Sequence, residues 1–171
     1  LEGPLEIHDY IRGKGSYRQV IEALKAAKKE GIRTIIASTL NKLTVEKVEY
    51  ILEIARKFDS MASFQPLTFT LLDINEPNPL LPSLASYRKA INRLIALKRR
   101  GSPYIYNSLM GLKYFYKWPD TPQLLCSAGK LFFRIEADGR IFSCSRFQPP
   151  WQGRYIRPDF DLCKMIRNLN S

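Results

Sequence analysis

Three cysteines carry the clearest candidate chemistry in this 171-residue chain. Cys126 and Cys144 flank a segment typical of a β-hairpin, with Gly139 in its "ADG" turn, and Cys163 follows after an irregular loop. A hairpin of this length brings its two ends together, so both sulfurs can reach one centre. Thiolates in a reducing compartment suit zinc or an iron–sulfur cluster. Spacing alone leaves a metal site and unrelated core thiols equally favoured, because no C-x-x-C pair is present, and an odd cysteine count disfavours a disulfide framework.

Charge is distributed unevenly along the chain, which has a net charge of +11. Residues 1–75 carry 11 Lys/Arg and 10 Asp/Glu, whereas residues 76–171 carry 16 and 6. A basic half suits nucleic acid, an acidic peptide, solubility or compensation for a buried anionic centre. Nucleic acid is an unlikely partner here because the basic residues are scattered. No signal-peptide pattern and no membrane-spanning apolar run is visible, so we expect a cytoplasmic protein with no membrane partner.

The elements that must position these residues alternate in type. The pattern predicts a helix over 15–32, a strand over 32–38, a helix over 44–58 and a strand over 61–72. Ser16 and Thr44 are the expected N-caps, and Gly31 is the expected stop of the first helix. Helix, strand, helix and strand at this spacing predict βα units on a parallel sheet.

Residues 75–82 are rich in proline and mark a predicted boundary, after which the pattern of predicted elements changes. The next predicted elements are a helix that ends at Gly101 and a shorter, aromatic helix that Asn107 opens. The aromatic residues in and around this shorter helix, within "YIYNSLMGLKYFYKW", have two interpretations. The favoured one is a packing face between the barrel and the cysteine-bearing region, and the other is a surface on which nucleic-acid bases stack. From Trp118 onward, short strands and turns predominate.

The motifs together resemble a known family. Cys-x12-Gly-x4-Cys, with "IEADGRIFSC" leading to the second cysteine, resembles the start of the auxiliary-cluster (SPASM or twitch) domain of radical S-adenosylmethionine (SAM) enzymes. Upstream, "LEGPLEIHDYIRG", "TIIASTLNKLT" and "SFQPL" resemble segments at the fourth, fifth and sixth strands of the family's barrel. The family's Cys-x3-Cys-x2-Cys motif is absent, and so is the C-x2-C-x5-C-x3-C run of a full SPASM domain.

The resemblance implies an α/β fold: the C-terminal half of a partial (β/α)6 radical SAM barrel, followed by a small SPASM/twitch-like domain of a β-hairpin and a helix. It places the barrel part at residues 1–75, a helical linker at 76–117 and the cysteine domain at 118–171. The missing C-terminal cysteine run favours the simpler, one-cluster twitch type or a chain cut before that run.

Site residues are carried over from the family one at a time. Arg12 falls where family members bind the SAM carboxylate, a task suited to a guanidinium. Glu2 replaces the usual Asp at the edge of the strand and is expected near the SAM ribose. Asn41 either hydrogen-bonds SAM or closes a turn, and Gln65 either faces the barrel interior or has no role at the site. His8, the only histidine, is expected to organise its turn.

By the same resemblance, Cys126, Cys144 and Cys163 are the expected ligands of an auxiliary [4Fe-4S] cluster. A fourth ligand would come from beyond Ser171 or from the substrate, or the cluster would have no fourth ligand. Some of the basic charge in residues 76–171 would then offset the negative charge of the cluster.

The expected function is that of a radical SAM iron–sulfur oxidoreductase. With its N-terminal cluster, such an enzyme forms a 5′-deoxyadenosyl radical from SAM and modifies a peptide or small-molecule substrate, using an electron donor such as ferredoxin or flavodoxin. The 171 residues alone are expected to be inactive in SAM cleavage. The alternative is a non-catalytic thiolate-metal or nucleic-acid-binding module on a truncated α/β scaffold.

Overall fold

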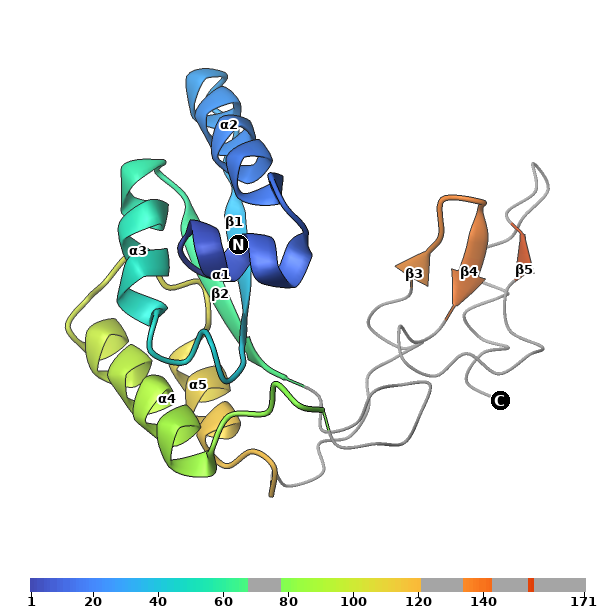
Figure 1. Cartoon of the computed structure of the whole chain (residues 1–171). Coiled ribbons are helices and arrows are strands. Elements are labelled where there is room, and N and C mark those ends of the chain that lie inside the picture. The colour runs from blue at the N-terminus through green and yellow to red at the C-terminus, as the bar shows by residue number, and fades with distance from the viewer. Residues whose placement is uncertain (68–77, 121–133, 143–153, 156–171) are drawn as a thin grey trace. The chain divides into compact units, whose positions relative to one another are not determined.

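A computed structural model of the chain forms two compact units, Leu1–Thr121 and Pro122–Ser171. Each unit is described by itself. The described residues are 1–67, 78–120 and 134–142, together with the backbone of residues 154–155 (Figure 1).

The first unit alternates helices and strands around a small parallel sheet (Figure 1). Its elements are α1 (Leu5–Arg12), α2 (Ser16–Lys29), β1 (Ile35–Leu40), α3 (Val48–Lys57), β2 (Met61–Pro66), α4 (Leu84–Arg99) and α5 (Leu109–Tyr116). β1 and β2 pair in parallel, with Ile35 opposite Met61 and Leu40 opposite Pro66. The predicted βα units on a parallel sheet are therefore confirmed. The described strands form an open sheet and not a closed barrel.

The other edge of β2 is continued by the segment before α5. The Ala62 nitrogen donates to the Tyr104 carbonyl at 2.7 Å, and the Tyr106 nitrogen donates to the Ala62 carbonyl at 2.8 Å. Asn107 then extends this ladder with its side chain. Its Oδ1 accepts from the Phe64 nitrogen at 2.8 Å, and its Nδ2 donates to the Phe64 carbonyl at 2.9 Å. The side chain thus replaces the main chain where the backbone leaves the sheet for α5.

This role corrects the expectation that Asn107 opens the helix. The N-cap of α5 is Ser108, whose hydroxyl accepts a hydrogen bond from the Gly111 nitrogen at 3.0 Å. An asparagine next to a serine offers two candidate caps, and the buried backbone of Phe64 competes for the amide because unpaired polar groups there are costly.

The two faces of the β1–β2 sheet differ in burial. Ile36, Leu40 and Phe64 are buried on one face, whereas Ile35 and Gln65 are exposed on the other. Side chains alternate between faces along a strand, and the parallel register places like faces together. One face of the sheet therefore carries the core, and the other is accessible.

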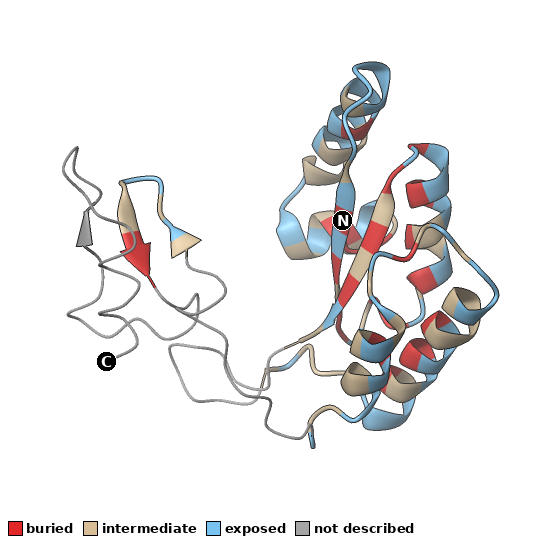
Figure 2. Cartoon of the chain, turned by 180° about the vertical axis from the view of Figure 1, so that it is seen from behind, coloured by how far each residue is buried: buried red, intermediate tan, exposed pale blue. Residues whose placement is uncertain are grey.

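One hydrophobic core joins the elements of the first unit (Figure 2). It includes Leu24 of α2, Ile51 of α3, Ile91 of α4 and Leu112 of α5. The buried residues of α3 and of α4 recur at helical spacing, so each of these two helices presents one apolar side to the core. Helix α4 is also linked to α5 by the Tyr87 hydroxyl, which donates to the Phe115 carbonyl at 3.0 Å.

The predicted N-caps Ser16 and Thr44 are wrong as well. Ser16 is the first residue of α2 rather than its cap, and the left-handed Gly15 takes the cap position. Thr44 is buried one turn before α3, which begins at Val48 after Lys47. Helix α4 begins after Ser83, whose hydroxyl accepts from the Ser86 nitrogen at 3.1 Å. Gly31, with a φ of 65°, follows the end of α2 as predicted.

The second unit contains a short antiparallel sheet in its described part. It consists of β3 (Arg134–Ile135), β4 (Arg140–Phe142) and β5 (Arg154–Tyr155), in the order β3-β4-β5. Gly139 has a φ of 82° in the turn between β3 and β4, and its nitrogen donates to the Glu136 carbonyl at 2.9 Å. The predicted hairpin with its "ADG" turn is confirmed. In the described residues of both units, no helix is long and apolar enough to cross a bilayer.

Candidate functional site

Glu2 lies at the outer edge of β1, close to where that strand ends. Only 2% of the residue is exposed. Its Oε2 accepts from the Thr39 nitrogen at 3.0 Å, and the Leu1 nitrogen donates to the Ala37 carbonyl at 3.1 Å. Residues 1–2 therefore run along the free edge of β1, and the Glu2 carboxylate satisfies a backbone group that would otherwise be unpaired.

Arg12 ends helix α1 and turns back onto Glu2. Its Nε donates to Glu2 Oε1 at 3.1 Å, and its Nη2 forms an ion pair with the same oxygen. The Arg12 side chain is nevertheless 56% exposed, so the outer part of the guanidinium faces solvent. The structure thus brings the two predicted residues Glu2 and Arg12 into direct contact at the C-terminal end of β1.

His8 holds the backbone of Glu2 in place. Its Nδ1 accepts a hydrogen bond from the Glu2 nitrogen at 3.0 Å, and the residue is 3% exposed. Burial, more than any neighbouring charge, lowers the pKa of His8, which favours the neutral ring that this acceptor role requires. The described residues hold no group of His, Cys, Asp and Glu that could bind a metal ion. The hydrogen bond from the Glu2 nitrogen ties His8, within α1, to the residues that precede this helix, a structural role of the kind that the sequence predicted.

Asp9 fixes the start of the helix that follows. Its carboxylate accepts from the Gly15 nitrogen at 2.7 Å and from the Tyr17 nitrogen at 2.8 Å. These two backbone donors lower the pKa of the Asp9 carboxyl. Asp9 therefore caps α2 from the preceding helix, and these hydrogen bonds also constrain the short loop after Arg12.

We call Glu2, His8, Arg12 and Thr39 the strand-edge cluster.

Asn41 closes the turn after β1. Its Oδ1 accepts from the Leu43 nitrogen at 2.8 Å, and its backbone nitrogen donates to the Thr44 hydroxyl at 2.8 Å. The Thr44 hydroxyl in turn donates to the Thr39 carbonyl at 2.6 Å. Of the two roles expected for Asn41, the turn is the one that these contacts display. It also fixes Thr39, the neighbour of Glu2.

Gln65 lies on the accessible face of the sheet. Its Nε2 lies 3.4 Å from the Thr39 hydroxyl across the β1–β2 pair. Thr39 thus contacts Glu2 through its nitrogen and Gln65 through its side chain. Glu2 and Gln65 therefore both contact one strand residue at the carboxyl end of the sheet, and Arg12 is joined to it through Glu2. This is the edge at which α/β folds bind ligands.

The three predicted metal ligands, Cys126, Cys144 and Cys163, lie outside the described residues. The described part of their unit includes the hairpin between the first two, in which Arg134 pairs with Phe142 and Ile135 with Ile141. The terminal helix expected around Cys163 also lies outside the described residues.

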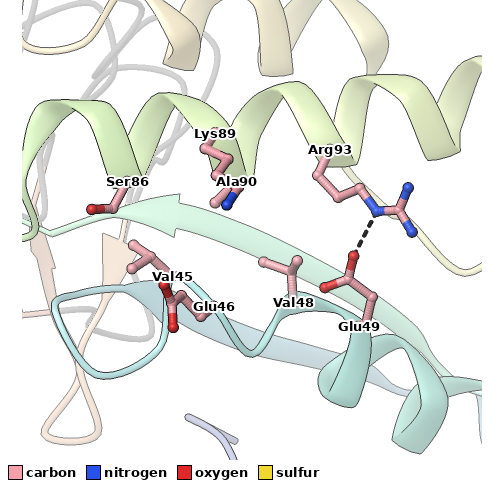
Figure 3. Close-up of a pocket in the computed structure, with 8 residues that line it drawn as sticks. All are labelled: Val45, Glu46, Val48, Glu49, Ser86, Lys89, Ala90 and Arg93. Atoms are coloured by element: carbon pink, nitrogen blue, oxygen red, sulfur yellow. Dashed lines mark hydrogen bonds and ion pairs between the residues drawn. The ribbon is translucent and has the colours of Figure 1, made fainter.

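A pocket of about 490 Å³ lies between α3 and α4 (Figure 3). Val45, Val48 and Ala90 form its apolar part, and an ion pair of 2.6 Å between Arg93 Nε and Glu49 Oε1 crosses from one helix to the other. None of the predicted site residues lines this pocket.

Sequence reasoning missed Thr39 and Asp9 as members of the site. Thr39 acts through its backbone nitrogen, so its residue type carries no signal. Asp9 stands six residues before the backbone nitrogen that it caps at Gly15, outside the usual cap spacing. An aspartate that precedes a Gly-x-Gly-Ser loop could have indicated this contact.

Comparison with known proteins gives distant relatives and no family. No family model matches the chain. It is 28% identical over 148 residues to an uncharacterized protein of Archaeoglobus fulgidus, a match that covers 83% of this chain and 35% of that protein. It is 24% identical over 156 residues to the cysteine-type anaerobic sulfatase-maturating enzyme of Clostridium novyi, with 84% and 41% covered. The chain thus spans between about a third and two fifths of the length of these curated relatives.

Proposed function

We propose that the chain is the C-terminal portion of a radical SAM iron–sulfur enzyme. The observation that carries this proposal is the extent of the match to the sulfatase-maturating enzyme. A match over 84% of the chain exceeds the length of the first unit, which ends at Thr121, so it includes part of the cysteine-bearing unit. One distant relative therefore matches part of the first unit and part of the unit that bears the Cys126–Cys144 motif.

The strand-edge cluster fits a ligand with a carboxylate. Glu2 holds Arg12 by its Nε and Nη2, and the exposed part of the guanidinium keeps further N–H donors for a second carboxylate. In this proposal Arg12 binds the carboxylate of SAM, and Glu2 is the positioning residue that orients the guanidinium. Gln65 and Thr39 offer polar groups on the same accessible face. SAM, when bound, would supply the radical chemistry of the family.

The cysteine unit would hold the auxiliary [4Fe-4S] cluster. Cys126 and Cys144 are the proposed thiolate ligands on either side of the β3–β4 hairpin, with Cys163 as the third. A peptide substrate is favoured over a small molecule because the named relative matures another protein, a sulfatase. An electron donor such as ferredoxin or flavodoxin is the proposed redox partner. No observation on the described residues favours the alternative of a non-catalytic binding module.

Anaerobic reconstitution of the chain with iron and sulfide tests this proposal. We expect a brown protein with broad absorption in the blue, because thiolate-bound iron–sulfur clusters absorb there. The colour should be lost in Cys126→Ala and Cys144→Ala and retained in Ser127→Ala, a matched control next to the first cysteine. A colourless protein with stoichiometric zinc, or a cluster that survives both cysteine substitutions, would contradict the proposal.

A further inference from the structure

The α4–α5 region differs in charge from the rest of the first unit. Residues 78–120 contain eight Lys/Arg and a single carboxylate, Asp120. Residues 1–67 contain eleven Lys/Arg and nine Asp/Glu, so their charges nearly balance. Most of the net positive charge of the described residues therefore lies in the α4–α5 region.

One side of α5 presents part of this charge beside an exposed methionine. Met110, Lys113 and Lys117 are spaced by three and four residues, so they lie on one side of the helix, and Leu112 is buried on the opposite side. Met110 is 73% exposed. We call Met110, Lys113, Lys117 and the neighbouring Arg88–Tyr116 pair the α5 face.

Arg88 joins α4 to this face. Its guanidinium carbon lies 5.6 Å from the centre of the Tyr116 ring, and Tyr116 is itself 36% exposed. The Nε of Arg88 is buried and has no hydrogen-bond partner among the described atoms. Within the described residues, no carboxylate forms an ion pair with Arg88, Lys113 or Lys117. The positive charge of the α5 face is therefore not neutralised by the described part of the chain.

We propose that the α5 face is a docking site for a separate protein that presents carboxylates beside apolar side chains. The positive charge of the face is complementary to such a partner. A second copy of the chain is disfavoured as the occupant, because it carries a net charge of +11 and like charges brought together at an interface are costly.

The composition of the face favours a protein over a nucleic acid. Protein interfaces are enriched in Met, aromatic residues and Arg. Met110, Tyr116 and Arg88 match that composition, and Lys113 and Lys117 add positive charge beside them. A nucleic-acid surface depends instead on many cations that follow a phosphate backbone, often with several aromatic rings for the bases. The inference does not rest on the proposed function, because it requires neither cluster nor SAM.

A titration followed by NMR tests the docking site. The probe is a synthetic helical peptide with leucines along one side and glutamates beside them, added to the full chain at low salt. We expect saturable shifts of the backbone amides at Met110, Lys113 and Lys117, with an affinity that falls as salt is added. Lys113→Glu together with Lys117→Glu should weaken binding at least about tenfold, since the α5 face then repels the peptide.

Matched controls separate docking from general attraction. Lys14→Glu with Lys29→Glu changes the net charge equally at exposed lysines that form no ion pair in the described structure, and it should leave the affinity within about twofold. A peptide of the same composition with scrambled leucines should bind more weakly, and Met110→Ala should remove that difference. Equal loss in both lysine pairs, or no shifts on α5, would overturn the proposal. Tighter binding of oligothymidylate at the same residues would assign the face to nucleic acid instead.

Discussion

The strand-edge cluster and the α5 face handle charge in opposite ways. Glu2 is buried and accepts from both Arg12 and the Thr39 nitrogen, whereas Lys113 and Lys117 have no carboxylate partner in the described residues. A charge with an internal partner holds the fold together at that point, and a charge without one remains available to an external ligand. Arg12 stands between the two cases, because it is bound on one side and exposed on the other.

The largest effect on stability should come from Glu2→Ala. This change removes the acceptor of the Thr39 nitrogen and the partner of Arg12 together. Because Arg12 can return to solvent, we expect a loss nearer to that of a few hydrogen bonds, about 2 kcal/mol, than to that of a fully buried ion pair. Urea denaturation measures this loss directly.

Glu6→Ala provides the control for that change. Glu6 is an exposed acidic residue in the first turn of α1, and its removal should cost well under about 1 kcal/mol. If Glu2→Ala and Glu6→Ala shifted the urea midpoint equally, the buried carboxylate would have no structural role, and the contrast with the α5 face would disappear.

A smaller effect is expected from Asn107→Ala, which tests how α5 is attached to the sheet. The change leaves the Phe64 nitrogen and carbonyl without their side-chain partner. Unpaired backbone groups of this kind cost about 1–2 kcal/mol in total when solvent reaches them in part. Asn107→Asp keeps the acceptor for the Phe64 nitrogen but loses the donor to its carbonyl, so its effect should be intermediate.

Asn92→Ala on the exposed side of α4 is the matched control and should be nearly neutral. Hydrogen exchange at the Phe64 amide supplies a local measurement. We expect faster exchange in Asn107→Ala than in the control, and equal rates would show that the Asn107 amide does not hold this part of the sheet.

The parallel βα arrangement was predictable because it rests on repeated signals. The apolar spacing of the helices and the β-branched strand at Ile35 and Ile36 each indicate their element locally. The hairpin turn was equally predictable, since a left-handed position in a short turn favours glycine, as at Gly139.

The contacts of the site were less predictable because they join residues far apart in the sequence. Glu2 and Thr39 are separated by 37 residues, and Phe64 and Asn107 by 43. In each case a side chain satisfies a backbone group, and neither partner's residue type identifies the other. The errors at Ser16, Thr44 and Asn107 share this cause, because polar residues near a helix start have several possible partners.

The smallest expected effect is a pH dependence of the folding stability, which arises from His8 in the strand-edge cluster. Burial is the main cause that lowers the pKa of His8 from its ordinary value of 6.5; Arg12 acts in the same direction, and Glu2 and Asp9 oppose it. The unfolded chain therefore takes up a proton on His8 at a higher pH than the folded chain. The stability associated with His8 is complete above about pH 6.5 and falls as the pH drops toward the folded pKa.

Because His8 is the only histidine, its ring signals in a proton NMR spectrum can be assigned without ambiguity. We expect a lower titration midpoint in the folded chain than in urea, and His8→Gln should flatten the change of stability below pH 6.5. Binding of the acidic peptide to the α5 face should change little over the upper part of this range, where its glutamates stay ionised, since arginine and lysine also keep their charge there. A folded midpoint at or above the midpoint in urea would mean that His8 gains a proton on folding, which is incompatible with Nδ1 as the acceptor for the Glu2 nitrogen.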